Sequence, residues 1–296
     1  MIVLNELEYA EKCISENIVE KKPFSTLNIL AKYYYHHLGK DEKEIIDILK
    51  DFAKKNCTGY SKNKYVWDNN IAKMVEVAIQ YPLHQIKGVW ITSKELTTIR
   101  NIHNKALERL AFTILCLAKY NIMKNPKSDG WINNDIKEIF SLARISAGIN
   151  ERGIKLHELY KLGLIDLAKK IDNLSIKVCF VDNDKSGNEL FISDFRELGY
   201  EYLLYRGENF IRCGECGILV RGNKAGTKHY CSSCIAYSPI ETKKLICIDC
   251  GDEFTVDARN AHKDRCSNCY EVHRAKRKLE TQRIRRNNAK MKSEVF

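Results

Sequence analysis

The stretch RCGECGILVRGNKAGTKHYCSSC, residues 212–234, places two Cys-x-x-Cys pairs on either side of a short basic segment. Residues 247–269, CIDCGDEFTVDARNAHKDRCSNC, repeat the pattern of Cys-x-x-Cys-Gly followed by Cys-Ser-x-Cys. This internal repeat indicates a duplicated module. Two residues between thiols let both sulfurs of a tight turn face one ion, and two such pairs complete a closed shell of four thiolates.

Eight of the 12 cysteines fall into these pairs. We predict two structural Zn²⁺ ions, held by Cys213, Cys216, Cys231, Cys234, Cys247, Cys250, Cys266 and Cys269. The repeat favours grouping successive pairs, and a cross-braced arrangement of the first pair with the third and the second with the fourth is the alternative. Residues 208–270 resemble the zinc ribbon family, a fold too small to be stable without its metal.

The other cysteines, Cys13, Cys57, Cys116 and Cys179, are scattered in apolar surroundings, and we expect them in the core. The start, MIVLNELEYAEK, has no charged segment followed by an apolar run, so export is not expected. The longest apolar stretch, 110–118, is too short to span a bilayer. We expect a protein of the bacterial cytoplasm that binds no membrane, where thiols stay reduced.

The formal charge of +11 is concentrated at the C-terminus. Residues 271–296 hold nine Lys and Arg against three acids, whereas residues 207–270 hold nine against eight. Such a field favours a polyanionic partner through phosphate contacts and counterion release. We therefore predict nucleic acid as the partner, with DNA favoured over RNA. A solvated, solubilising tail is the alternative.

Residues 104–182 show a second pattern. NKALERLAFTILCLAKYNIM places apolar residues at helical spacing, a short Trp131-Ile132 segment follows, and NNDIKEIFSLARI and INERGIKLHELYKLG predict two further helices. Apolar side chains alternate at Ile176, Val178 and Phe180 after the turn-forming sequence DNLS, which predicts a hairpin. This element order resembles the winged-helix family, in which the third helix can enter a major groove. Docking of a partner protein is the alternative role.

The N-terminal region predicts helices over residues 4–15, 26–37, 42–55 and 65–80. The stretch FSTLNILAKYYYHHLGKDEKEIIDILKDFAKKNC, followed by WDNNIAKMVEVAIQYP, resembles the small helical domain at the C-terminal side of primase-polymerases. No two-Asp polymerase site precedes it, so the resemblance implies a replication setting without primer synthesis. An ordinary helical bundle is the alternative. Further along, GNELFISDFRELGYEYLLYRGENF predicts a strand and a helix that ties Tyr200, Leu203 and Leu204 to the preceding core.

The predicted fold class is mainly α with small β sheets. The predicted domains are a helical domain (1–92), a winged-helix-like domain with a connector (93–206), zinc ribbon 1 (207–240), zinc ribbon 2 (241–270) and a basic helical tail (271–296). In its modular makeup and its lysine- and asparagine-rich composition, the chain resembles tandem zinc-ribbon proteins of phages and mobile elements in Gram-positive bacteria. That resemblance favours a viral or mobile-element role.

No catalytic constellation is visible, and neither an enzyme nor a small-molecule substrate is expected. The leading hypothesis is a zinc-dependent nucleic-acid-binding protein that acts in transcription control or replication. Its predicted contacts are Arg152, Lys155, Lys161, Lys169, Lys170, Arg221, Lys224, Lys228, Arg274, Lys276, Arg277, Arg283, Arg285 and Arg286. The rival hypothesis is an adaptor or inhibitor that binds a host protein, such as a defence nuclease or polymerase, through its ribbons and winged helix.

Overall fold

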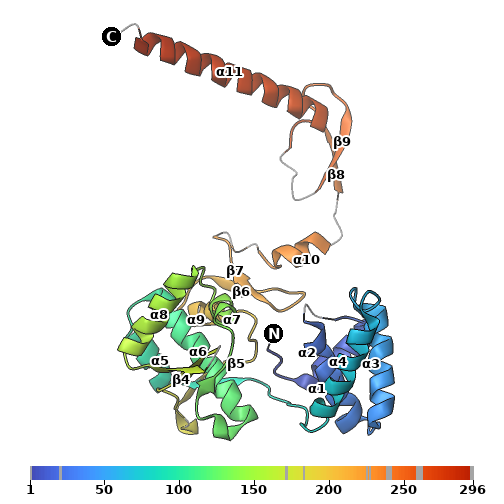
Figure 1. Cartoon of the computed structure of the whole chain (residues 1–296). Coiled ribbons are helices and arrows are strands. Elements are labelled where there is room, and N and C mark those ends of the chain that lie inside the picture. Colours follow the sequence, from blue (N-terminus) through green and yellow to red (C-terminus); the bar gives the residue numbers. More distant parts are fainter. Residues whose placement is uncertain are drawn as a thin grey trace. The chain divides into compact units, whose positions relative to one another are not determined.

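A computed structural model describes residues 2–19, 22–170, 173–182, 184–224, 226, 228–237, 242–257 and 263–293. The chain divides into two compact units, residues 1–231 and 232–296, and each is described by itself. Helices dominate and the sheets have two or three strands, so the predicted fold class is confirmed (Figure 1). None of the helices in the described part of the chain is long and apolar enough to cross a membrane.

The N-terminal region is a small helical bundle with its own core. It comprises α1 (Glu6–Glu16), α2 (Pro23–Lys32) with a π-helical turn (Tyr33–His37), α3 (Glu42–Asn56) and α4 (Lys64–Ala78), close to the four predicted helices. Leu27, Ile45 and Ile71 from three of these helices are fully buried together. Amphipathic spacing explains this result, because each helix turns one apolar stripe towards the others.

The middle region follows the predicted order of elements. It contains α6 (Lys105–Lys124), a 3-10 turn (Pro126–Ser128), β2 (Trp131–Ile132), α7 (Ile136–Leu142), α8 (Ile149–Lys161), β3 (Ile165–Lys170) and β4 (Asn173–Val178). The three strands form one antiparallel sheet in the order β2-β4-β3. Helix α6 runs through the main core, where Leu110, Phe112 and Ile114 are fully buried. Assignment to the winged-helix family stays a prediction.

The hairpin differs from its prediction in where it turns. Leu174 and Ser175 were expected in the turn, but they lie in β4 and pair with Lys169 and Ala168. Leu174 packs against the main core, which accounts for its place in the strand. The connecting residues 171–172 lie outside the described part of the chain.

The strand predicted in GNELFISDF is present, but the two-stranded sheet to which it belongs was not predicted. Strand β1 (Val89–Thr92) pairs antiparallel with β5 (Asn188–Ile192), which follows a 3-10 turn (Lys185–Gly187). Helix α5 (Ser93–Arg100) starts from β1 with a capping box in which Thr92 and Glu95 bond each other's backbone N–H groups. Glu95 is buried and forms an ion pair with Lys119 of α6 at 2.7 Å.

Helix α9 (Leu198–Tyr205) joins the main core to the first ribbon. Leu198 and Tyr202 belong to the main core, and the hydroxyl of Tyr202 donates a hydrogen bond of 2.7 Å to Glu108. The expectation that Tyr200, Leu203 and Leu204 join the same core is wrong. They pack on the hairpin that follows, because the opposite side of α9 already fills the main core.

The remaining elements are short hairpins and two helices. Strands β6 (Phe210–Arg212) and β7 (Leu219–Arg221) form one hairpin, followed by α10 (Ser232–Tyr237). Strands β8 (Thr242–Ile246) and β9 (Glu253–Asp257) form the other, followed by the long α11 (Ser267–Ser293). Of the four cysteines outside the Cys-x-x-Cys motifs, Cys13, Cys57 and Cys116 are buried as predicted. Cys179 is exposed, with its Sγ 3.5 Å from Asp166, so the prediction was wrong there.

Candidate metal centres and basic surface

The first Cys-x-x-Cys pair lies in the turn of the β6–β7 hairpin. The N–H of Gly217 donates to the carbonyl of Cys213 at 2.9 Å, and the N–H of Cys213 donates to the carbonyl of Ile218 at 2.9 Å. Gly217 has a φ of +68°, in the left-handed region that favours glycine. These bonds make a tight turn that points both sulfurs to the same side.

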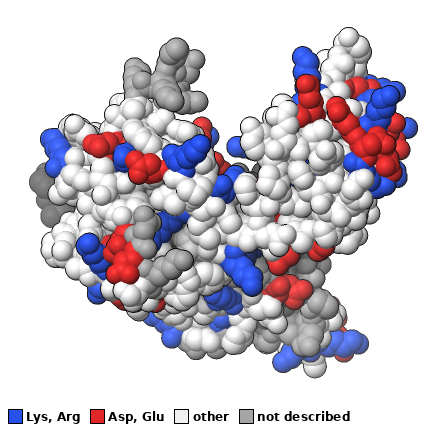
Figure 2. All heavy atoms as spheres, turned by 90° about the horizontal axis from the view of Figure 1, so that it is seen from below, with Lys and Arg blue, Asp and Glu red and all other residues white. Residues whose placement is uncertain are grey.

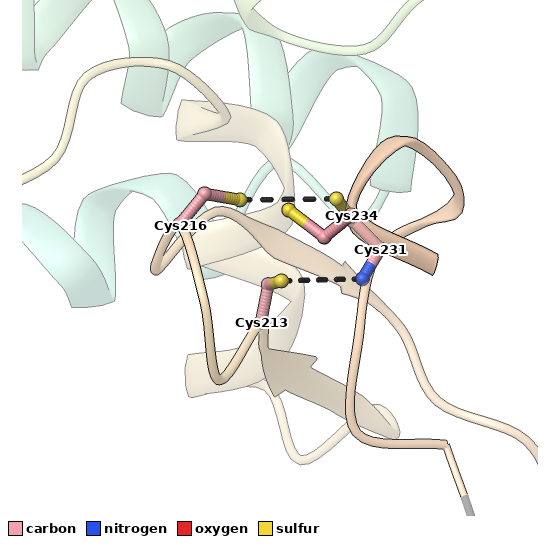
Figure 3. Close-up of side chains that lie close together, drawn as sticks. All are labelled: Cys213, Cys216, Cys231 and Cys234. Atoms are coloured by element: carbon pink, nitrogen blue, oxygen red, sulfur yellow. Dashed lines mark hydrogen bonds between the residues drawn. The ribbon is translucent and has the colours of Figure 1, made fainter. Parts of the chain in front are cut away.

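The second pair completes a four-sulfur group. Cys231 directly precedes α10 and Cys234 lies in its first turn. Figure 3 shows the side chains of Cys213, Cys216, Cys231 and Cys234 converging. The ligand atoms of the four residues lie within 4.8 Å of one another, and the Sγ atoms of Cys216 and Cys231 are 3.7 Å apart.

The second ribbon reproduces this geometry with Cys247, Cys250, Cys266 and Cys269. Gly251, at a φ of +75°, donates its N–H to the carbonyl of Cys247 at 2.9 Å, as Gly217 does to Cys213. The Sγ atoms of Cys250 and Cys266 are 3.8 Å apart. Each group therefore joins two successive pairs, as the internal repeat favours, and the cross-braced alternative does not occur.

The spacing of the sulfurs fits a tetrahedral thiolate shell. With four sulfurs about 2.3 Å from one ion, neighbouring sulfurs in a regular tetrahedron are about 3.8 Å apart. The separations of 3.7 Å and 3.8 Å match that value. Each group could therefore hold one metal ion of the kind that prefers sulfur ligands, and four protein donors leave no position open for water.

Backbone amides prepare one sulfur of each group for metal binding. Hydrogen bonds from the N–H groups of Cys216 and Cys231 lower the pKa of Cys213 to about 6, the latter over 3.3 Å. The amides of Cys266 and Cys250 lower that of Cys247 to about 6. In the same group, the hydrogen bond with Cys266 raises the pKa of Cys269 to about 11. Neighbouring thiolates repel, so a full set of four requires a cation among them.

The first ribbon is fixed to the main body of its unit by a small apolar core. Phe210 of β6 and Leu219 of β7 are buried against Leu203 of α9, and the rings of Tyr200 and Phe210 have centroids 4.7 Å apart. Ion pairing of Arg212 with the buried Glu201 at 2.9 Å adds to this contact. The hairpin that carries Cys213 and Cys216 is therefore packed against α9.

Arg196, just before α9, links this part of the chain to the turn that contains Cys213 and Cys216. Arg196 donates from Nη2 to the carbonyl of Cys216 at 3.0 Å, while its guanidinium also pairs with Asp194. A guanidinium with several fixed donors can hold two such partners at once. Sequence reasoning did not identify Arg196, Phe210 or Leu219.

The second ribbon has different side chains at the equivalent positions. When the repeats are aligned on their first Cys-x-x-Cys pairs, Phe210 and Leu219 correspond to Lys244 and Glu253, which form an exposed ion pair at 2.7 Å. Ile246 and Ile248 are 70% and 62% exposed. Among the described residues, no side chain of the second ribbon belongs to a hydrophobic core cluster.

Helix α11 begins within the second four-cysteine group. It begins at Ser267, between the ligands Cys266 and Cys269, and the N–H of Tyr270 donates to the carbonyl of Cys266 at 2.9 Å. From Arg274 to Arg285 every residue is exposed. The predicted contacts Arg274, Lys276, Arg277, Arg283 and Arg285 therefore project from this helix, and the side chain of Arg286 lies outside the described residues.

Two of the predicted nucleic-acid contacts in the middle region are partly buried or already paired. Arg152 is half-buried and Lys155 forms an ion pair with Glu151 at 3.3 Å, so of the three predicted cations on α8 only Lys161 is fully exposed. The most exposed apolar side chains of α8 are Ile149, at 83%, and Ile154, at 58%. Lys169 and Lys170 lie on β3, but their side chains are outside the described residues.

The first ribbon offers three predicted cations, two of which have internal partners. Arg221 lies 3.6 Å from Glu208, and Lys228 donates to the carbonyl of Arg221 at 2.8 Å. Lys224 is exposed. On the face of the molecule drawn in Figure 2, basic and acidic side chains are interspersed and do not form one continuous basic area.

Comparison of the chain with family models, with curated proteins and with solved structures gave no match.

Proposed function

We propose that this protein holds two structural Zn²⁺ ions and binds nucleic acid through its second ribbon and α11. The main support for this proposal is that a long, exposed and basic helix starts inside a four-cysteine group. Zinc at that group would fix the first turn of α11 and so give its cations a defined direction.

Charge and exposure support α11 as the main contact. Residues 271–296 carry nine Lys and Arg against three acids, and the cations from Arg274 to Arg285 are all exposed. The cations predicted elsewhere include several that already have partners, among them Lys155 and Lys228. An exposed cation releases a counterion when it meets a phosphate, whereas a cation with an internal partner must first give that partner up. Among the α11 cations, Arg274 forms an ion pair with Glu271 at 3.6 Å, and both side chains are exposed, so this pair contributes little.

The process served is proposed from the family resemblances of the sequence. These resemblances favour transcription control or replication in a phage or mobile element. Within that setting, the first ribbon, fixed against α9, would act as a structural element, and the second would carry the nucleic-acid contact.

The salt dependence of binding tests this function. The zinc-loaded full chain and a chain that ends at residue 270 would be titrated with labelled duplex DNA at several salt concentrations. Truncation after residue 270 retains Cys269, so both four-cysteine groups stay intact. We expect the full chain to show a steep fall of log K with log salt, and the truncated chain a slope smaller by several units. Equal slopes would contradict the proposal.

A second candidate function is docking of a host protein, and the exposed apolar surface of α8 favours it. Ile149 and Ile154 lie on the helix that was predicted to read DNA, yet apolar side chains suit a protein partner better than phosphates. Pull-down from host lysate after nuclease treatment separates the two functions. Docking predicts a stoichiometric protein that survives the nuclease and is lost on Ile154→Asp, while nucleic-acid binding predicts neither.

A further inference from the structure

We infer that α11 contacts its partner through one face only and that this partner is duplex DNA, with the helix lying in the major groove. This inference rests on the proposed function and deepens it. A tail that binds only by its total charge would use all of its cations equally. Because the tail is a helix, its cations point in different directions around the helix axis and cannot all contact one partner equally.

Four cations of α11 share one side of the helix. Successive residues are about 100° apart around an α-helix, so Arg274, Arg277, Lys278 and Arg285 fall within an arc of about 100°. Tyr270 and Thr281 lie in the same arc. Between Tyr270 and Arg285, none of the residues in this arc is acidic. This basic face runs for about 16 Å along the axis from Arg274 to Arg285. Glu271 lies just outside this arc and forms an exposed ion pair with Arg274 at 3.6 Å.

The opposite side of α11 has a different character. Val272 and Leu279, 56% and 59% exposed, lie there together with Lys276 and Arg283. Apolar side chains gain nothing from a phosphate, so the two sides are not equivalent towards a polyanion. If the basic face meets the partner, Lys276 and Arg283 point away from it.

The shape of the element favours duplex DNA over duplex RNA. An α-helix with its side chains is about 10–12 Å across, and the major groove of B-form DNA, about 12 Å wide, admits one. The major groove of A-form RNA is deep and too narrow for side chains to read. All residues of α11 from Arg274 to Arg285 are exposed, so the helix can enter a groove without leaving a buried contact.

Two double variants form a matched test. Lys278→Gln with Arg285→Gln removes two cations of the basic face, and Lys276→Gln with Arg283→Gln removes two from the other side. Each pair has one lysine and one arginine seven residues apart, and glutamine forms helices well. The zinc-loaded full chains would be titrated with labelled duplex DNA and with duplex RNA of the same sequence, over a range of salt concentrations. Circular dichroism checks that the variants keep their helicity.

We expect the first pair to lower the salt slope for DNA by about two units, and the second pair by much less. Equal losses from both pairs would overturn the one-sided face while leaving nucleic-acid binding in place. Equal affinity for RNA, with the same order of variants, would overturn the major-groove assignment. Failure of the wild-type chain to bind either duplex would instead contradict the proposed function itself.

Discussion

Lys244 and Glu253 form a cross-strand ion pair of 2.7 Å in the second ribbon, at the positions that Phe210 and Leu219 occupy in the first. In the first ribbon this pair of positions is apolar and buried against α9. The two copies thus share a metal-binding geometry but differ in their outer surface. One is built to pack against the rest of its unit and the other to face water.

This difference predicts unequal effects of side-chain removal. Leu219 is 1% exposed, so Leu219→Ala should cost about 2–5 kcal/mol of unfolding free energy. The three tryptophans, Trp67, Trp90 and Trp131, all lie in residues 1–231, so urea unfolding followed by their fluorescence reports on this unit.

The repeat-equivalent variant Glu253→Ala serves as the control. It removes one partner of an exposed ion pair, which contributes about 0–1 kcal/mol. It should leave the fluorescence transition and the metal content unchanged. A cost from Leu219→Ala below about 1 kcal/mol would show that the first ribbon is not docked through this core.

Loss of the second centre should melt α11. An isolated helix must form a costly first turn before it gains hydrogen bonds, and in α11 this turn contains the ligand Cys269. Cys250→Ser should therefore remove one metal ion and reduce the helical signal in circular dichroism. In a chain ending at residue 270 the same substitution should have little effect on that signal. A full-length Cys250→Ser chain with undiminished helicity would show that α11 forms without the metal.

The burial of the Glu201 carboxyl predicts a specific pH dependence. Burial raises the pKa of Glu201 above its ordinary value of 4.5, as does Asp194, although Arg212 lowers it. In the pH interval between the unfolded and folded pKa values, the folded state holds a proton that the unfolded state has lost. The stability contributed by Glu201 therefore falls as pH rises through that interval and is constant above it.

Glu201→Gln removes this titration while keeping the shape of the side chain. The unfolding free energy of the variant minus that of the wild type should increase as pH rises from 4.5 towards neutrality. Urea unfolding at several pH values measures this difference. A difference that stays constant or falls with pH would contradict the burial of a charged Glu201.

Two helical glycines should respond in opposite directions to alanine. At Gly199 of α9 a Cβ would lie 2.0 Å from the backbone oxygen of Ala143, whereas at Gly153 of α8 nothing lies within 4 Å. We expect Gly199→Ala to cost about 1–3 kcal/mol or more of unfolding free energy. Gly153→Ala should stabilise by about 0.5–1 kcal/mol, because alanine favours a helix interior. Thermal unfolding of both variants checks the close packing of α9 on the segment after α7, and a tolerated Gly199→Ala would contradict it.

The sequence predicted best those features that depend on local spacing. The separation within each Cys-x-x-Cys pair and the repeat of the whole module predicted which four sulfurs come together. Apolar periodicity likewise predicted the four N-terminal helices and the elements from α6 to β4. In both cases the information lies in residues close together in the chain.

Features that depend on distant contacts were not predicted. Strand β1 pairs with β5 about a hundred residues later, and four residues such as Val89–Thr92 carry no local sign of that partner. Tyr200 was assigned to the wrong core because an amphipathic pattern shows which side is apolar and not what covers it. Comparing the two ribbons position by position would have revealed the docking role of Phe210 and Leu219.

The number of metal ions bound per chain decides whether both four-cysteine groups are metal centres. Native mass spectrometry and elemental analysis of the purified chain, of Cys216→Ser and of Cys250→Ser would count the ions in each four-cysteine group. We expect two zinc ions in the wild type, one in each variant, and tetrahedral thiolate spectra when cobalt replaces zinc. A folded wild-type chain without zinc, or a single substitution that removes both ions, would contradict two independent centres.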